Sequence, residues 1–176
     1  LGPFRWQPSL APEWSLADAF GKRYASKECN GKPMVIVFYL GFGCLHCAEQ
    51  IQALIPKKEE FDKAGIEILA ISTEDQELLK IGLSNFDKGK IPFPLLADPD
   101  QKIFKAFRAY DDFEKTPLHA TFLIDPEGRI LWRDISYEPF MKIDFLLEES
   151  QRLLNNQKFH SGNSGNHNGG VPVTSK

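Results

Sequence analysis

The stretch that decides the fold is Met34-Val-Ile-Val-Phe-Tyr-Leu-Gly-Phe-Gly-Cys-Leu-His-Cys47. Its first part, from Met34 to Leu40, is continuously apolar and rich in β-branched and aromatic residues, which is typical of a strand buried on both faces. Gly41-Phe42-Gly43 then permits a tight bend. Apolar residues recur after the bend at helical spacing, at Ala48, Ile51 and Leu54. We therefore predict a buried strand that leads directly into a helix, with two cysteines at the junction.

The position of this cysteine pair predicts reactive thiols. Unpaired backbone N–H groups and the helix dipole favour an anion at a helix N-terminus, and a thiolate is such an anion. The thiol pKa there falls from about 8.5 into a range of about 3.5–7.5. We predict Cys44 and Cys47 as the catalytic pair, supported by Gly43 and His46. The imidazole of His46 would further stabilise a thiolate, and this makes the disulfide more oxidising, so we expect a disulfide donor.

The rest of the chain predicts an α/β fold with a central mixed β-sheet flanked by helices. A helix between the strands at 34–40 and 66–71 makes a parallel crossover, and Pro56 should kink that helix or begin a second one. Turn residues at 126–128 predict an antiparallel hairpin. The other predicted elements are a hairpin at 14–25, a strand at 93–97 and three helices. Two of these helices begin near 72 and 98, and the last runs from about 139 to 154.

We expect three segments along the chain. Residues 1–12 form an extended lead-in, residues 13–154 a single redox domain, and residues 155–176 a flexible tail. The tail is rich in Asn, Gly and Ser, so it cannot bury enough apolar surface to offset the entropy of ordering. The chain begins at Leu1 instead of Met, which indicates a processed form or a piece of a longer protein, and its compartment is not predicted.

Composition limits the classes of partner and cofactor. The formal net charge of −3 in 176 residues gives no basic footprint for nucleic acid. The longest apolar run, residues 34–40, is too short to insert in a membrane as a helix. We predict no cofactor, because a zinc site would need two ligands besides the cysteine pair, and only Cys29 and a histidine could supply them. Cys29 is expected to pack as a small apolar residue, and His160 and His167 are too sparse for a metal site.

The chain resembles the redoxins of the alkyl hydroperoxide reductase/thiol-specific antioxidant family, which belong to the thioredoxin superfamily. Their active-site strand has the form V-x-V-F-Y, followed by Gly and a C-x-x-C pair, as in residues 34–47. The resemblance continues through residues 69–72, 92–100 and 120–130, and it covers about residues 13–154. It implies a thioredoxin-like fold of the peroxiredoxin type with an N-terminal extension.

The resemblance implies two possible mechanisms. In thiol–disulfide exchange, Cys44 attacks a substrate disulfide and Cys47 resolves the mixed disulfide, so that the partners are protein or small-molecule thiols and disulfides. In a thiol peroxidase, Cys47 attacks a hydroperoxide and Cys44 resolves the sulfenic acid. The chain departs from the peroxidase pattern P-x-x-x-T-x-x-C, since Leu40 replaces the Pro and Cys44 the Thr. His119 stands where peroxiredoxins carry an Arg.

The resemblance also draws attention to the segment Thr116-Pro117-Leu118-His119. Thioredoxins have a cis-proline there, facing the cysteine pair. Either His119 replaces that proline or Pro117 fills its role, and we favour His119 because the following residues align without a gap. An alternative of another class is a Cu(I)-binding module that uses Cys44, Cys47 and His119 as ligands.

Overall fold

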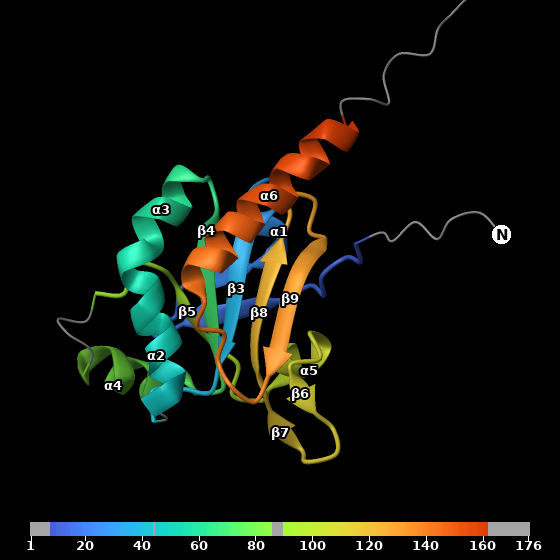
Figure 1. Cartoon of the computed structure of the whole chain (residues 1–176). Coiled ribbons are helices and arrows are strands. Elements are labelled where there is room, and N and C mark those ends of the chain that lie inside the picture. The colour runs from blue at the N-terminus through green and yellow to red at the C-terminus, as the bar shows by residue number, and fades with distance from the viewer. Residues whose placement is uncertain (1–7, 44, 86–89, 162–176) are drawn as a thin grey trace, which may run out of the picture.

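The computed structural model of this protein describes residues 8–43, 45–85 and 90–161. Its main strands are β1 (Ser15–Asp18), β2 (Arg23–Ala25), β3 (Met34–Tyr39), β4 (Glu67–Ser72), β5 (Leu95–Ala97), β8 (His119–Ile124) and β9 (Ile130–Ser136). They form one seven-stranded mixed sheet in the order β2-β1-β5-β4-β3-β8-β9 (Figure 1). A separate two-stranded sheet, which the sequence did not predict, pairs β6 (Tyr110–Asp111) with β7 (Thr116–Pro117).

The centre of the sheet follows the predicted crossover. β3 pairs in parallel with β4, and β4 pairs in parallel with β5. β8 runs antiparallel beside β3, with Phe38 opposite Ala120, and β9 continues the sheet antiparallel to β8. The β1–β2 hairpin joins the other edge through an antiparallel pair with β5. All six residues of β3 are buried, as the apolar run predicted.

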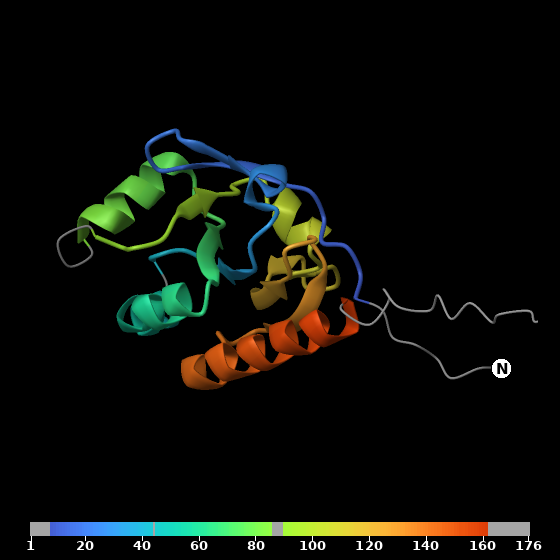
Figure 2. The ribbon, with the colours of Figure 1, turned by 90° about the horizontal axis from the view of Figure 1, so that it is seen from above.

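The helices are α1 (Ser26–Cys29), α2 (Leu45–Leu54), the 3-10 turn η1 (Ile55–Lys57), α3 (Lys58–Lys63), α4 (Gln76–Asn85), α5 (Lys102–Ala106) and α6 (Ile143–Ser161). α2, α3 and α6 cover one face of the sheet, and α5 covers the other (Figure 2). The break between α2 and α3 occurs at η1, which contains Pro56 near its start. This agrees with the predicted interruption, since proline cannot donate the N–H bond that a continuous helix requires.

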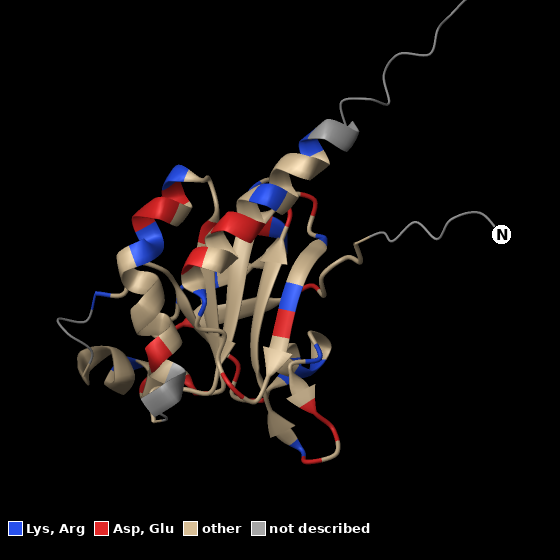
Figure 3. Ribbon diagram, in the orientation of Figure 1, with Lys and Arg blue, Asp and Glu red and all other residues tan. Residues whose placement is uncertain are grey.

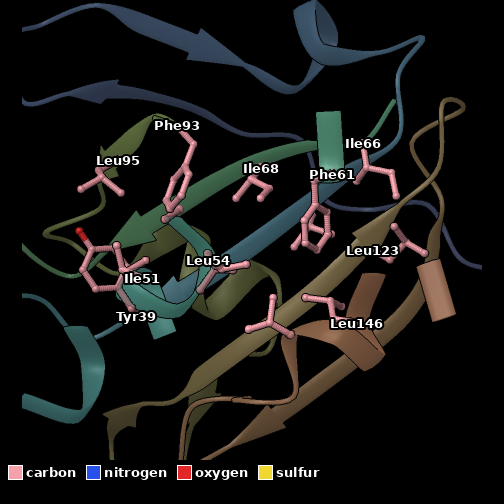
Figure 4. Close-up of a cluster of buried hydrophobic side chains, with 14 of the residues drawn as sticks. Tyr39, Ile51, Leu54, Phe61, Ile66, Ile68, Phe93, Leu95, Leu123 and Leu146 are labelled. Carbon is pink, nitrogen blue, oxygen red and sulfur yellow. The ribbon is translucent and has the colours of Figure 1, made fainter. Parts of the chain in front are cut away.

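Two clusters of buried apolar side chains hold the layers together. The first lies under α2, α3 and α6 and includes Tyr39, Leu54, Phe61, Leu123 and Leu146 (Figure 4). The second lies on the α5 face, where the ring of Phe38 packs against the rings of Phe104 and Phe122. Successive residues of β3 alternate between the clusters, because side chains of a strand point to opposite faces. The sheet therefore separates a core that touches α2 from one that does not.

Two turns are organised by aspartates. The carboxylate of Asp98 accepts hydrogen bonds from the backbone N–H groups of residues 102, 103 and 104 and so caps α5. The carboxylate of Asp125 accepts the N–H groups of Glu127 and Arg129 in the β8–β9 turn, and Arg129 also donates its Nε–H. Both carboxylates satisfy donors that local geometry would otherwise leave unpaired.

Two helix boundaries differ from the prediction. α4 does not begin near Ser72, which is the buried last residue of β4; it begins at Gln76, and Asp75 Oδ1 accepts the N–H of Leu78. α6 begins at Ile143 and continues past Leu154 to Ser161, so the expected tail boundary at residue 155 falls within the helix. The regular apolar spacing ends at Leu154, but the helix continues because its backbone i to i−4 bonds continue.

The charged residues are mixed along the helices. On α3 the acidic residues lie between two lysines, and on α6 the acidic residues lie in the first half and the basic residues in the second (Figure 3). Several of these charges form ion pairs within one helix, such as Lys63 with Glu59 and Arg152 with Glu149. Among the described residues, no helix is both long enough and apolar enough to cross a bilayer.

Candidate active site

The cysteine segment lies between the end of β3 and the first turn of α2. β3 ends at Tyr39, a loop follows, and α2 begins at Leu45, which places Cys47 in the first turn of that helix. Cys44 and the side chains of residues 45–47 lie outside the described residues. The backbone thus supplies the helix N-terminus that the predicted thiolate chemistry needs. The positions of the two sulfur atoms and the contribution of His46 stay predictions.

The bend before the cysteines depends on Gly41 more than on Gly43. Gly41 has a φ of 107°, which residues with a side chain rarely adopt, and a Cβ atom there would lie 2.6 Å from Glu74 Cδ. A Cβ atom at Gly43 would meet nothing within 4 Å. Sterics therefore do not require glycine at position 43, and the conformational constraint falls two residues earlier, at Gly41.

His119 begins β8 beside the exit of β3. It directly precedes Ala120, which pairs with Phe38, and its side chain is only 3% exposed. Pro117 lies instead in β7, where it pairs with Tyr110 in the separate two-stranded sheet. Because β3 and β8 are antiparallel, the start of β8 and the end of β3 lie at the same end of the sheet (Figure 1). This placement supports the choice of His119 over Pro117.

Burial sets the charge state of His119. Desolvation lowers the pKa of its imidazole below the ordinary value, and the nearby Glu138 carboxylate opposes this only in part. The ring is therefore neutral at neutral pH. A neutral imidazole can accept a proton from a thiol, but it supplies no fixed positive charge.

A buried polar pair that the sequence analysis missed ties α2 to β8. Gln50 is fully buried on α2, and its Nε2 donates to Thr121 Oγ1 at 2.9 Å. Gln50 lies one helical turn after Cys47, and Thr121 lies two residues after His119 on the same face of β8. Both elements start at the same end of the sheet. Position 47, one turn before Gln50 on α2, therefore lies toward His119, which is two residues before Thr121 on β8. The signal in the sequence is that Gln50 is a polar residue on the same helix face as Cys47 and Leu54.

Cys29 does not join this site. It ends α1 before β3 begins, and the six residues of β3 separate it from the cysteine loop by about 17 Å at the usual rise of a strand. It packs instead against the second core cluster, as predicted for a small apolar residue. The described residues therefore give no support for a zinc site that combines Cys29 with the pair.

Other metal-binding predictions fall on residues that the structure leaves out. No cluster of three His, Cys, Asp or Glu side chains suitable for a metal occurs within the described part of the chain. The thiols of Cys44 and Cys47 are not included in that part, so the Cu(I) alternative is not tested. His167 and the side chain of His160 also lie outside it.

Comparison with known proteins decides the family. The model of the AhpC/TSA family matches residues 9–133, which is most of the chain. The chain belongs to the AhpC/TSA family. This confirms the resemblance that residues 34–47 carried, and it places the protein among oxidoreductases.

Individual AhpC/TSA relatives carry two kinds of name. Peroxiredoxin Q of Suaeda salsa is 30% identical over 148 residues, covering 82% of this chain and 67% of the relative. Thiol-disulfide oxidoreductase ResA of Bacillus subtilis is 31% identical over 124 residues, covering 70% of this chain and 64% of the relative. The chain thus spans about two thirds of the length of these curated relatives.

Solved structures confirm the predicted fold. The reduced 2-Cys peroxiredoxin of Plasmodium vivax superposes with a TM-score of 0.75 at 19% identity, covering 86% of this chain and 98% of that one. At this level of identity the likeness establishes the fold alone. The chain therefore has the thioredoxin-like fold of the peroxiredoxin type, with a central mixed sheet flanked by helices.

Proposed function

We propose that this AhpC/TSA protein is a thiol–disulfide oxidoreductase that cycles between a dithiol and a disulfide at Cys44 and Cys47. The observation that supports the proposal is that Cys47 lies in the first turn of α2, the helix that follows the fully buried strand β3. A helix N-terminus stabilises a thiolate, and cysteines three residues apart lie on one side of a helical turn. The similarity to ResA supports the same class of reaction.

In the proposed exchange, the two electrons that reduce the substrate disulfide come from the thiols of Cys44 and Cys47. The Cys44 thiolate attacks one sulfur of a substrate disulfide, and the substrate S–S bond breaks to release a thiolate. Cys47 then loses its proton and attacks Cys44 of the mixed disulfide, which releases the second substrate thiol. The substrate gains two electrons, and the protein is left with a Cys44–Cys47 disulfide. In the reverse direction the same steps deliver a disulfide to a dithiol partner, the direction that His46 favours.

His119 is the proposed proton acceptor for Cys47. The second step needs a base near the first turn of α2, and His119 begins β8 at that end of the sheet. Its imidazole is neutral because burial lowers its pKa, so it can take the Cys47 proton as the thiolate forms. Gln50 and Thr121 hold α2 and β8 in the register that this transfer requires.

The second candidate is a thiol peroxidase, which the similarity to peroxiredoxin Q favours. Cys47 would attack the O–O bond of a hydroperoxide, giving an alcohol or water and a Cys47 sulfenic acid. Cys44 would then condense with the sulfenic acid, releasing water and forming the same disulfide. The neutral His119 offers no positive charge where peroxiredoxins carry an arginine. For this reason we rank peroxide reduction second.

One experiment separates the candidates. The couple is titrated against reduced and oxidised glutathione, and hydrogen peroxide loss is measured in the same reduced sample. We expect a reversible two-electron disulfide, exchange with glutathione disulfide, and little peroxide consumption. Cys44→Ser should abolish exchange, and Cys29→Ser serves as the matched control that keeps it. Fast peroxide loss that survives Cys44→Ser would favour the peroxidase instead.

A further inference from the structure

The loop that precedes the cysteines is held by the loop that follows the neighbouring strand. β3 and β4 are parallel neighbours, so the segments that leave them, residues 40–43 and 73–75, emerge at the same edge of the sheet. Thr73 Oγ1 donates a hydrogen bond to the carbonyl oxygen of Leu40 at 3.1 Å. The backbone N–H of Phe42 donates to Glu74 Oε1 at 3.0 Å. Two successive residues of one loop therefore fix two residues of the other.

The carboxylate of Glu74 is itself held in place. Ser72 Oγ donates to Glu74 Oε2 at 3.2 Å and accepts the backbone N–H of Glu74 at 3.1 Å. Ser72 is fully buried at the end of β4, so this bracing is anchored in the core. Glu74 therefore presents an immobilised acceptor oxygen to the backbone at Phe42.

Glu74 lies directly against the backbone of residues 40–43, the loop that precedes the cysteines. A Cβ atom at Gly41 would lie 2.6 Å from Glu74 Cδ, so the carboxylate packs directly against the glycine backbone. The ring of Phe42 is fixed as well, because a Cβ atom on Gly82 of α4 would lie 2.1 Å from Phe42 Cδ2. The same ring packs edge-on against Tyr39 at 5.7 Å. Phe42 is thus held at its backbone by Glu74 and at its ring by α4.

We propose that Glu74 is a positioning residue that fixes the entry to α2 through the backbone N–H of Phe42, and that the reactivity of Cys44 depends on this contact. The proposal rests on the proposed function, since it concerns the reactivity of the same cysteine. Phe42 lies two residues before Cys44, so a shift of its backbone moves the thiol relative to the N–H groups that stabilise the thiolate. Small displacements of a reacting group lower rates steeply. Glu74 acts through its acceptor oxygen and its shape, and its negative charge is not the cause.

The test compares Glu74→Ala with Glu74→Gln, which keeps the size and the acceptor oxygen but removes the charge. Alkylation of Cys44 by iodoacetamide is followed from pH 5 to 10, with tandem mass spectrometry to separate Cys44 from Cys47. Glu74→Ala should move the midpoint of this profile to higher pH and slow the reaction at pH 7 by about fivefold to tenfold. Glu74→Gln should stay within about threefold of the parent, as should the control Glu77→Ala at an exposed acid of α4.

A second variant keeps the proposal testable if Glu74→Ala fails to fold. Gly82→Ala places a methyl group against the ring of Phe42, so it should move the midpoint in the same direction. Combined with Glu74→Ala it should add less than its separate effect, because both act on Phe42. An unchanged midpoint in Gly82→Ala, or equal shifts to lower pH in Glu74→Ala and Glu74→Gln, would overturn the proposal. Because alkylation needs no disulfide substrate, it also distinguishes this outcome from a failure of the exchange assay.

Discussion

The two ends of β3 carry cysteines in opposite electrostatic settings. At the entrance, Cys29 is the last residue of α1, and burial together with the carboxylates of Glu67 and Glu28 raises the pKa of its thiol. At the exit, Cys47 lies in the first turn of α2, where the helix dipole favours a thiolate. We propose that the end of the helix that a cysteine occupies, together with the nearby charges, sets the difference in reactivity between Cys29 and Cys47.

The polar groups at the two ends also differ. At the entrance, Asp125 and its donors Glu127 and Arg129 close a turn in which each group satisfies another. At the exit, polar side chains reach from one element to another: Gln50 of α2 to Thr121 of β8, and Glu74 to the cysteine loop. The first arrangement closes a local turn, whereas we propose that the second positions the site.

The largest effect should come from the cysteines themselves. Cys47→Ser removes the thiol that resolves the mixed disulfide, so the rate of exchange with glutathione disulfide should fall by about a thousandfold. Cys29→Ser should leave that rate unchanged, because Cys29 lies at the other end of β3. The rates are measured by stopped-flow fluorescence on the reduced proteins. A comparable loss in Cys29→Ser would remove the distinction between the two ends.

The next effect should come from His119. Replacing it with Asn removes the proton acceptor while keeping a buried polar group, so the rate of resolution by Cys47 should fall by about a hundredfold. The attack by Cys44 should change little, and pre-steady-state kinetics separate the two steps. Equal losses in both steps would indicate that His119 supports the loop as a whole instead of acting on Cys47.

A stability effect without a rate effect should come from the entrance end. Asp125→Ala leaves two backbone N–H groups and the Arg129 guanidinium without their acceptor, which should lower the free energy of unfolding by about 2 kcal/mol. The exchange rate of the folded protein should not change. Urea unfolding measures the first quantity, with Asp100→Ala at an exposed ion pair as the control. A fall in the exchange rate would show that the two ends are coupled.

The smallest effect is a pH dependence of stability at the exit end. The pKa of His119 is lower in the folded protein than in the unfolded chain, so the unfolded chain binds the proton more readily. The stability that His119 contributes is therefore present above about pH 6.5 and is lost as the pH falls below that value. Urea unfolding between pH 5 and 8 should show this slope in the parent and a flatter one in His119→Asn. An identical slope in both proteins would mean that His119 does not change its protonation on folding.

Much of the fold was predictable because its signals are local. The apolar run at 34–40, the glycine bend and the helical spacing after it predicted β3 and α2, and Pro56 predicted the break before α3. The turn residues at 126–128 predicted the β8–β9 hairpin. The α4 start was wrong, since Ser72 to Asp75 have the composition of a helix cap but Ser72 and Glu74 bond with each other and only Asp75 caps the helix.

The sequence by itself determined where the cysteines lie along the chain and which strand and helix flank the pair, because propensity, turn chemistry and periodicity act between near neighbours. Only the tertiary structure decided that Glu74 bonds to Phe42 and that Gln50 bonds to Thr121. It also decided that His119 is buried at the end of the sheet where β3 ends. Those partners are brought together by strand pairing and helix packing. No pattern of adjacent residues encodes a contact between segments that meet only when the sheet is assembled.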